Sequence, residues 1–129
     1  MLTQTEAISI LKNELSWPDV QVQIGRRAGF RCEYCGKDLL ASYENYDLWQ
    51  VDHIIPNGDN GIENLALSCK LCNFVKRGTD PSKTAKSNQR DDLINAAKEI
   101  INIRRKQKEA VYFKTRGCDR FTLMTSGRS

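Results

Sequence analysis

Two pairs of cysteines constrain this chain more than any other feature of its sequence. Each pair has the spacing C-x2-C, and 33 residues separate the two pairs. The four residues are Cys32, Cys35, Cys69 and Cys72. Zinc favours four tetrahedral ligands, and a two-residue spacer lets both sulfurs of a pair face one ion. We therefore predict one four-cysteine zinc site, with a redox dithiol or an iron site as the alternatives.

The predicted zinc site is structural, because four protein thiolates fill the tetrahedron and leave no open position for water. Any chemistry must then lie beside the zinc. The gap between the pairs is longer than a simple zinc ribbon needs, so its content is informative. The fifth cysteine, Cys118, has no cysteine near it in the sequence and is expected to be a plain thiol.

The sequence also indicates a cytoplasmic protein without a membrane partner. No apolar run approaches the roughly 18 to 20 residues that cross a bilayer. The first six residues lack the basic start and the apolar stretch of a secretory signal. Disulfides are rare in a reducing cytosol, which strengthens the metal interpretation of the paired cysteines.

The N-terminal segment, residues 1–29, is predicted to be helical. A T-x-x-E capping box begins one helix at Thr3, and Gly29 ends a second helix that starts near Pro18. The buried face of the second helix is expected to contain Val20, Ile24 and Ala28.

The remaining pattern predicts a small α+β domain over residues 1–129. Its core, residues 30–80, reads as a strand at 48–54, a loop at 57–61, a strand at 64–67 and a helix at 69–76. A long helix follows within 88–114, and residues 117–129 form a tail. Its apolar stripe runs through Leu93, Ala97, Ile100 and Ile101 and is extended by Val111 and Tyr112.

Charge is distributed unevenly along the chain. Residues 1–82 carry 8 Lys and Arg against 11 Asp and Glu, a net −3, while residues 83–129 carry 12 against 5, a net +7. A basic C-terminal third favours an anionic partner, of which nucleic acid is the commonest. A solvated helix face followed by a tail explains the charge equally well.

The chain contains a single histidine, His53. This excludes zinc proteases that need two histidines and any centre with several of them. A lone histidine is as often structural as functional, but the context of His53 changes that balance. It follows Asp52 and lies between the cysteine pairs, with Asn64 11 residues later and Asn73 directly after the last cysteine.

Together these motifs resemble the HNH, or His-Me finger, nuclease family. The matching segments are 31–36, 51–56, 61–65 and 67–73, together with Lys76. The resemblance covers about residues 26–77, and its motifs occur in the family's order, which is more specific than either cysteine pair alone. It implies a ββα-metal, treble-clef-like core stabilised by zinc, flanked here by N-terminal helices and the long C-terminal helix.

The resemblance also implies a role for each matched residue. His53 is the general base that activates water, and Asn64 braces the loop that orients it. Asp52 and Asn73 bind one catalytic divalent ion. Many relatives have histidine where this chain has Asn73, so it is an H-N-N variant. An amide oxygen suits a hard ion, whereas imidazole favours softer metals, so we expect Mg2+ or Mn2+ over Ni2+ or a second Zn2+.

The implied activity is a metal-dependent endonuclease that hydrolyses phosphodiester bonds and leaves 5′-phosphate and 3′-hydroxyl ends. Double-stranded DNA is the expected substrate, held through phosphate contacts with weak sequence specificity. A double-strand cut needs two active sites, so we also consider a homodimer formed through the helix at 89–113. The candidate phosphate-binding residues are Arg26, Arg27, Arg31, Lys76, Arg77, Arg104 and Arg105.

Two other classes of protein fit part of the same sequence. A non-catalytic, zinc-stabilised module that binds nucleic acid needs the cysteines and the basic face, but it leaves Asp52, His53, Asn64 and Asn73 together unexplained. A zinc module for protein interaction, such as a toxin or antitoxin component, would use the apolar stripe of the C-terminal helix as its partner surface.

Overall fold

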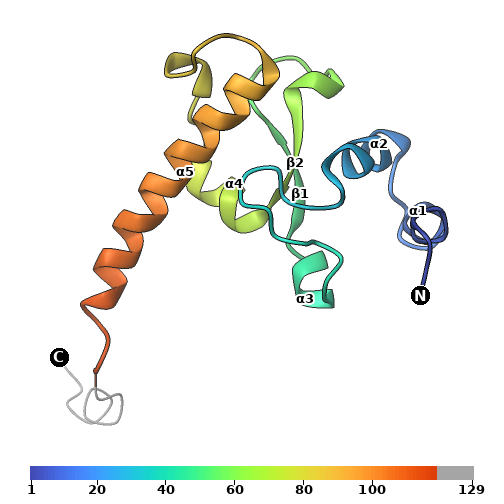
Figure 1. Cartoon of the computed structure of the whole chain (residues 1–129), viewed down its shortest axis with the longest axis horizontal. Coiled ribbons are helices and arrows are strands. Elements are labelled where there is room, and N and C mark those ends of the chain that lie inside the picture. The colour runs from blue at the N-terminus through green and yellow to red at the C-terminus, as the bar shows by residue number, and fades with distance from the viewer. Residues whose placement is uncertain (119–129) are drawn as a thin grey trace.

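The computed structural model describes residues 1–118 and confirms the predicted α+β class, with helices on both sides of one β-hairpin (Figure 1). The tail predicted at 117–129 lies outside the described residues from position 119 onward. The elements are α1 (Gln4–Asn13), α2 (Asp19–Ala28), α3 (Tyr43–Tyr46), β1 (Trp49–His53), the 3-10 helix η1 (Ile62–Asn64), β2 (Leu65–Cys69), α4 (Lys70–Lys76), the 3-10 helix η2 (Pro81–Lys83) and α5 (Arg90–Phe113).

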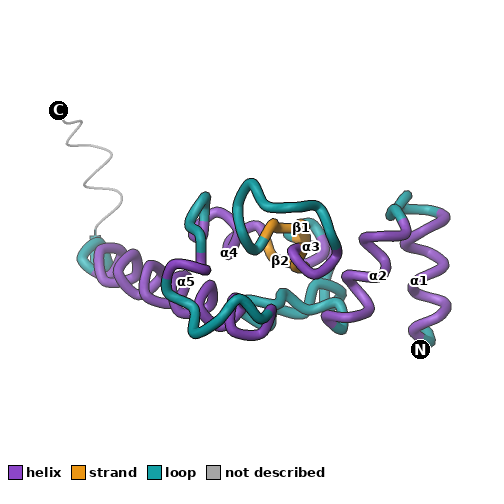
Figure 2. The backbone as a smooth tube through the Cα atoms, turned by 90° about the horizontal axis from the view of Figure 1, so that it is seen from above, coloured by secondary structure: helices purple, strands orange, loops and turns teal. Residues whose placement is uncertain are grey.

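The hairpin is the central layer of the fold. β1 pairs antiparallel with β2, so that Trp49 lies opposite Cys69 and His53 opposite Leu65. All five residues of β2 are buried. Seen from above in Figure 2, α2 lies on one side of the hairpin, and α4 and α5 lie on the other. Both faces of β2 are therefore covered, which explains its continuous burial.

The N-terminal helices follow the predicted caps, but their buried face differs from the prediction. The Thr3 hydroxyl accepts from the Glu6 backbone amide, which confirms the capping box, and Gly29 ends α2 with φ 63°. The prediction for Val20 was wrong, since it is exposed while Val22 is buried. The Phe30 ring explains the difference: a Cβ at Gly25 would lie 2.8 Å from it, so this ring packs against the Gly25 side of the helix.

The longest helix, α5, packs on the core only through its first half. Leu93, Ala97 and Ile101 are buried as predicted. Val111 and Tyr112 are exposed, so that part of the predicted stripe was wrong. From residue 102 onward the helix is exposed, and its last turns project from the body (Figure 1). Within residues 1–118, no helix has both the length and the apolar character to cross a membrane.

Candidate functional site

The four cysteines meet at one point, as the sequence predicted. Their sulfur atoms all lie within 4.8 Å of one another, and the sulfurs of Cys35 and Cys69 are 3.8 Å apart. A tetrahedron of sulfurs at about 2.3 Å from a zinc ion has edges of roughly 3.8 Å. The four cysteines are therefore positioned to hold one metal ion, and their number, type and spacing fit zinc.

Each cysteine pair is shaped by local backbone structure. In the first pair, the Cys35 amide donates to the Cys32 sulfur at 3.4 Å. In the second pair, Cys69 is the N-cap of α4, and its sulfur accepts from the Cys72 amide at 3.4 Å. The metal site thus joins the loop after α2 to the junction between β2 and α4.

Contact between the four sulfurs makes their ionisation uneven. Hydrogen bonds from Cys35, Cys69 and Cys72 lower the pKa of Cys32, because they stabilise its thiolate. The hydrogen bonds with Cys32, Cys35 and Cys69 raise the pKa of Cys72 instead, because Cys72 serves as a donor. Four thiolates can therefore gather here only with a cation that balances their charge.

Asp52 lies near the end of β1 in a buried ion pair. Its Oδ2 accepts from the Tyr34 hydroxyl at 2.6 Å and lies 3.1 Å from the Lys76 ammonium. The Lys76 side chain is only 1% exposed and also donates to the His53 carbonyl oxygen at 3.0 Å. Lys76 was predicted to bind phosphate, and in this arrangement a phosphate reaches it only if the pairing opens.

His53 faces the loop between the strands. Its Nε2 lies 2.7 Å from Oδ1 of Asn60. An amide oxygen only accepts, so Nε2 donates in this contact, and in the neutral ring Nδ1 then carries the lone pair. The ring is partly exposed to solvent.

Asn64 ties the two ends of that loop together. Its Oδ1 accepts from the Ile55 amide at 3.0 Å, and its Nδ2 donates to the carbonyl oxygens of Ile55 and Asp59 at 3.2 and 3.0 Å. Gly58 makes this approach possible, because a Cβ there would lie 2.7 Å from Nδ2 of Asn64. The segment that carries Asn60 is thereby held in place.

Asn73 lies on α4, on the same side of the hairpin as Asp52. Its Nδ2 donates to Oε1 of Gln50 at 2.5 Å, and Gln50 shares a face of β1 with Asp52. A hollow of about 530 Å³ opens beside Asn73. The structure thus pairs Asp52 with Lys76, Asn73 with Gln50 and His53 with Asn60. Within residues 1–118 no side-chain hydrogen bond or ion pair joins Asp52, His53 and Asn73 to one another.

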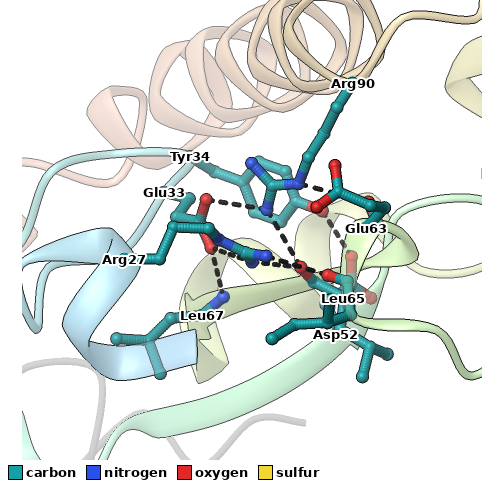
Figure 3. A network of polar contacts seen from close by, with 9 residues as sticks. Arg27, Glu33, Tyr34, Asp52, Glu63, Leu65, Leu67 and Arg90 are labelled. Atoms are coloured by element: carbon teal, nitrogen blue, oxygen red, sulfur yellow. Dashed lines mark hydrogen bonds and ion pairs between the residues drawn. The ribbon is translucent and has the colours of Figure 1, made fainter. Parts of the chain in front are cut away.

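A partly buried network accounts for Arg27, which was predicted to bind phosphate. Its guanidinium donates to the carbonyl oxygens of Ile62 and Leu65 and pairs with Glu33 at 3.1 Å (Figure 3). Arg90 of α5 pairs with the same carboxylate at 2.8 Å, and Glu33 accepts from the Leu67 amide. A phosphate at Arg27 would have to compete with these partners.

The other predicted phosphate-binding residues differ in whether they already have a partner within the fold. Arg104 donates to the carbonyl oxygens of Val75 and Lys76 and so caps the C-terminal end of α4. Arg31 donates to the Gly36 carbonyl oxygen and forms a loose pair, 3.6 Å, with Asp38. Three are exposed and without a carboxylate partner within residues 1–118: Arg26, Arg77 and Arg105.

Sequence reasoning missed the residues that hold the predicted ones. Asn60 stands in an N-G-D-N-G run, a pattern that predicts a loop but no partner for His53. Glu33 and Tyr34 lie between the first two cysteines and form no motif of their own. Arg90 is 57 residues from Glu33, and no spacing pattern connects residues so far apart.

A comparison with known families agrees with this geometry. Residues 32–77 match the family model described as HNH endonuclease. The matched range spans both cysteine pairs, the hairpin and α4. Residues 32–77 thus match an HNH endonuclease model and contain the four-cysteine metal site, and together these two findings indicate a nuclease or nucleic-acid-binding role. No curated protein and no solved structure matches the chain.

Proposed function

We propose that this chain is a metal-dependent endonuclease that hydrolyses phosphodiester bonds, with double-stranded DNA as its expected substrate and 5′-phosphate and 3′-hydroxyl ends as products. The observation that carries the proposal is the state of His53. This histidine lies within the HNH match, is partly exposed, and is held through Nε2 so that Nδ1 remains able to accept a proton.

His53 supplies the base that this reaction needs. A phosphodiester carries a negative charge and repels nucleophiles, so an attacking water must lose a proton as it adds to phosphorus. A neutral imidazole has a pKa close to the working pH and takes up such a proton efficiently. Asn60 holds the ring, and Asn64 holds the loop of Asn60.

Asp52 and Asn73 are the residues that would hold the catalytic divalent ion. Within residues 1–118, the Asp52 side chain uses only Oδ2 in its contacts and the Asn73 side chain uses only Nδ2. Each therefore retains one oxygen, the ligand type that Mg2+ and Mn2+ prefer. Such an ion, when bound, neutralises the phosphate and stabilises the departing oxygen. The Lys76 ammonium next to Asp52 opposes cation binding.

Plasmid nicking tests the proposal directly. Wild type and His53→Ala are compared in Mg2+, with DNA binding and thermal melting measured in parallel. Loss of a general base lowers the rate by roughly 10²- to 10⁴-fold, while binding and melting stay unchanged. Equal cutting by the alanine variant would refute the assignment of His53, and cutting in Ni2+ but not in Mg2+ would refute that of the metal.

The buried ion pair favours a second candidate function. Because Lys76 and Tyr34 already satisfy Oδ2 of Asp52, the domain can exist as a zinc-stabilised module that binds nucleic acid without cutting it. This alternative predicts DNA binding with no nicking by wild type in Mg2+, Mn2+ or Ni2+. The same assay therefore separates the two functions.

A further inference from the structure

An exposed aromatic ring, Phe74 of α4, lines two hollows. The first is the hollow beside Asn73, which Lys70 and Arg77 also line. The second, of about 330 Å³, lies between α4 and α5, and its lining includes Tyr112. The Phe74 side chain is 56% exposed. Leu71 and Tyr112 line the second hollow with Phe74 and are 44% and 60% exposed, so the ring belongs to an exposed apolar patch. Such a patch, here next to a proposed metal ligand, marks a binding surface.

The surroundings of this ring are strongly basic. Lys70 and Arg77 line the first hollow, Arg105 and Lys108 line the second, and Glu109 is the acid among the lining residues within 1–118. None of these four cations pairs with a carboxylate in the described part of the chain.

Two of the cations lie over the ring itself. The Arg77 guanidinium carbon is 4.3 Å and the Lys108 ammonium 5.1 Å from the Phe74 ring centre. We call Phe74 together with Lys70, Arg77, Arg105 and Lys108 the Phe74 surface.

An aromatic ring among unpaired cations fits an unpaired nucleotide better than a duplex. Every base has a flat face that stacks on an aromatic side chain, and the adjoining phosphates bind cations. In a duplex the base faces are already stacked, so an exposed ring gains little from it. An acidic peptide also satisfies the charges, but the surface continues into the hollow at Asn73, where the proposed function places the phosphodiester.

We propose that the Phe74 surface binds an unpaired segment of the nucleic-acid substrate. One base replaces a cation at the face of the Phe74 ring, and Arg77 and Lys108 turn to the flanking phosphates. The proposal rests on the proposed function for the identity of the polymer. It adds a substrate preference: single-stranded stretches, such as frayed or displaced strands, bind at the α4–α5 side of the site.

Fluorescence anisotropy tests this preference without any cleavage. The probes are a fluorescein-labelled single-stranded DNA oligonucleotide and the same sequence as a duplex, with no divalent ion added. Phe74→Ala is expected to weaken single-strand binding by about 5- to 150-fold, the range that loss of one base–aromatic stack gives, and duplex binding by less than about twofold. Phe74→Tyr keeps the stack and restores the affinity.

A matched control and a salt series complete the test. Tyr43 of α3 is 74% exposed and lies outside the Phe74 surface, so Tyr43→Ala leaves both affinities unchanged. Arg77→Gln and Lys108→Gln each reduce the slope of log affinity against log salt by about one, as loss of one phosphate contact does. Phe74→Ala leaves that slope unchanged, because stacking releases no counterions.

Several outcomes would overturn the inference. These are unchanged single-strand binding by Phe74→Ala, an equal loss for single strand and duplex, and no binding of either probe by wild type. Failure of the proposed function is distinguishable. If the protein binds single strands through Phe74 but nicks in no metal, the nuclease proposal fails and the Phe74 surface stands. If it nicks but Phe74→Ala changes no affinity, the nuclease proposal stands and the Phe74 surface fails.

Discussion

At the scale of single residues, the most consequential contact is the buried pair of Lys76 and Asp52. Burial, together with the charge and hydrogen bond of Asp52, raises the pKa of Tyr34 well above its ordinary value, so the phenol stays protonated and donates to Asp52. One carboxylate thus holds together β1, the first cysteine loop and α4. The same carboxylate is the proposed ligand of the catalytic ion, so stability and activity depend on one side chain.

We predict that Lys76→Met strongly destabilises the protein. The variant leaves the Asp52 carboxylate buried without a counter-charge, and breaking a buried pair costs about 3–5 kcal/mol. Urea unfolding measures the change. Adding Asp52→Asn removes the orphaned charge and restores part of the loss. Lys70→Met, an exposed lysine on the same helix, changes stability by no more than about 0.5 kcal/mol. If Lys76→Met were as stable as the wild type, the pair of Asp52 and Lys76 would not contribute to stability.

The sequence predicts the residues of this site only where a local motif identifies them. The cysteine spacing and the neighbours Asp52 and His53 were found because each forms a recognisable motif. The partner of Asp52 was not, because Lys76 stands next to Arg77 and looks like surface charge. Its burial depends on the packing of α4 across β1, which is a property of the tertiary structure.

At the scale of elements, the loop between β1 and β2 decides the orientation of His53. We predict that Gly58→Ala slows plasmid nicking. Its new Cβ would lie 2.7 Å from Nδ2 of Asn64 and 2.8 Å from the Ile55 carbonyl oxygen. The Asn64 amide must then shift, and a displacement near 1 Å in such a support costs up to about 100-fold in rate.

A second glycine provides the control for that experiment. Gly78 follows α4 and has no atom within 4 Å of the position that its Cβ would take. Gly78→Ala is therefore expected to nick at the wild-type rate. Equal rates for Gly58→Ala and wild type, measured on the same plasmid, would show that the loop tolerates the displacement.

The sequence predicted the order of the helices and strands better than it predicted which of their residues are exposed. The order of strand, loop, strand and helix was predicted because alternation and turn residues are local signals. The exposure of Val111 and Tyr112 was not, because a helical stripe indicates a face without indicating how far the core extends beneath it. α5 packs mainly on α4 and η2, so the point at which it leaves the core depends on where these distant segments lie in the tertiary structure.

At the scale of the whole molecule, the carboxylate of Glu33 connects distant parts of the chain. It pairs with Arg27 of α2 and Arg90 of α5. We predict that Glu33→Gln lowers the free energy of unfolding by about 2–3 kcal/mol, because two largely covered guanidinium groups lose their shared anion. Lys12→Gln breaks the exposed pair with Asp19 and costs at most about 1 kcal/mol. Similar losses in the two variants would contradict this ranking.

The zinc site and the Glu33 network both restrain the loop that contains Cys32 and Cys35, because Glu33 lies between these two cysteines. We predict that Cys69→Ser loses bound zinc and melts at a much lower temperature, since the binding free energy of structural zinc is also folding free energy. Elemental analysis and calorimetry measure both changes, and Cys118→Ser, outside the cluster, serves as the control. Because both restraints act on one loop, Glu33→Gln is expected to cost less in the Cys69→Ser background than in the wild type. Additive losses would show that the loop is held by two independent restraints, and full zinc content with wild-type melting in Cys69→Ser would refute the structural role of the site.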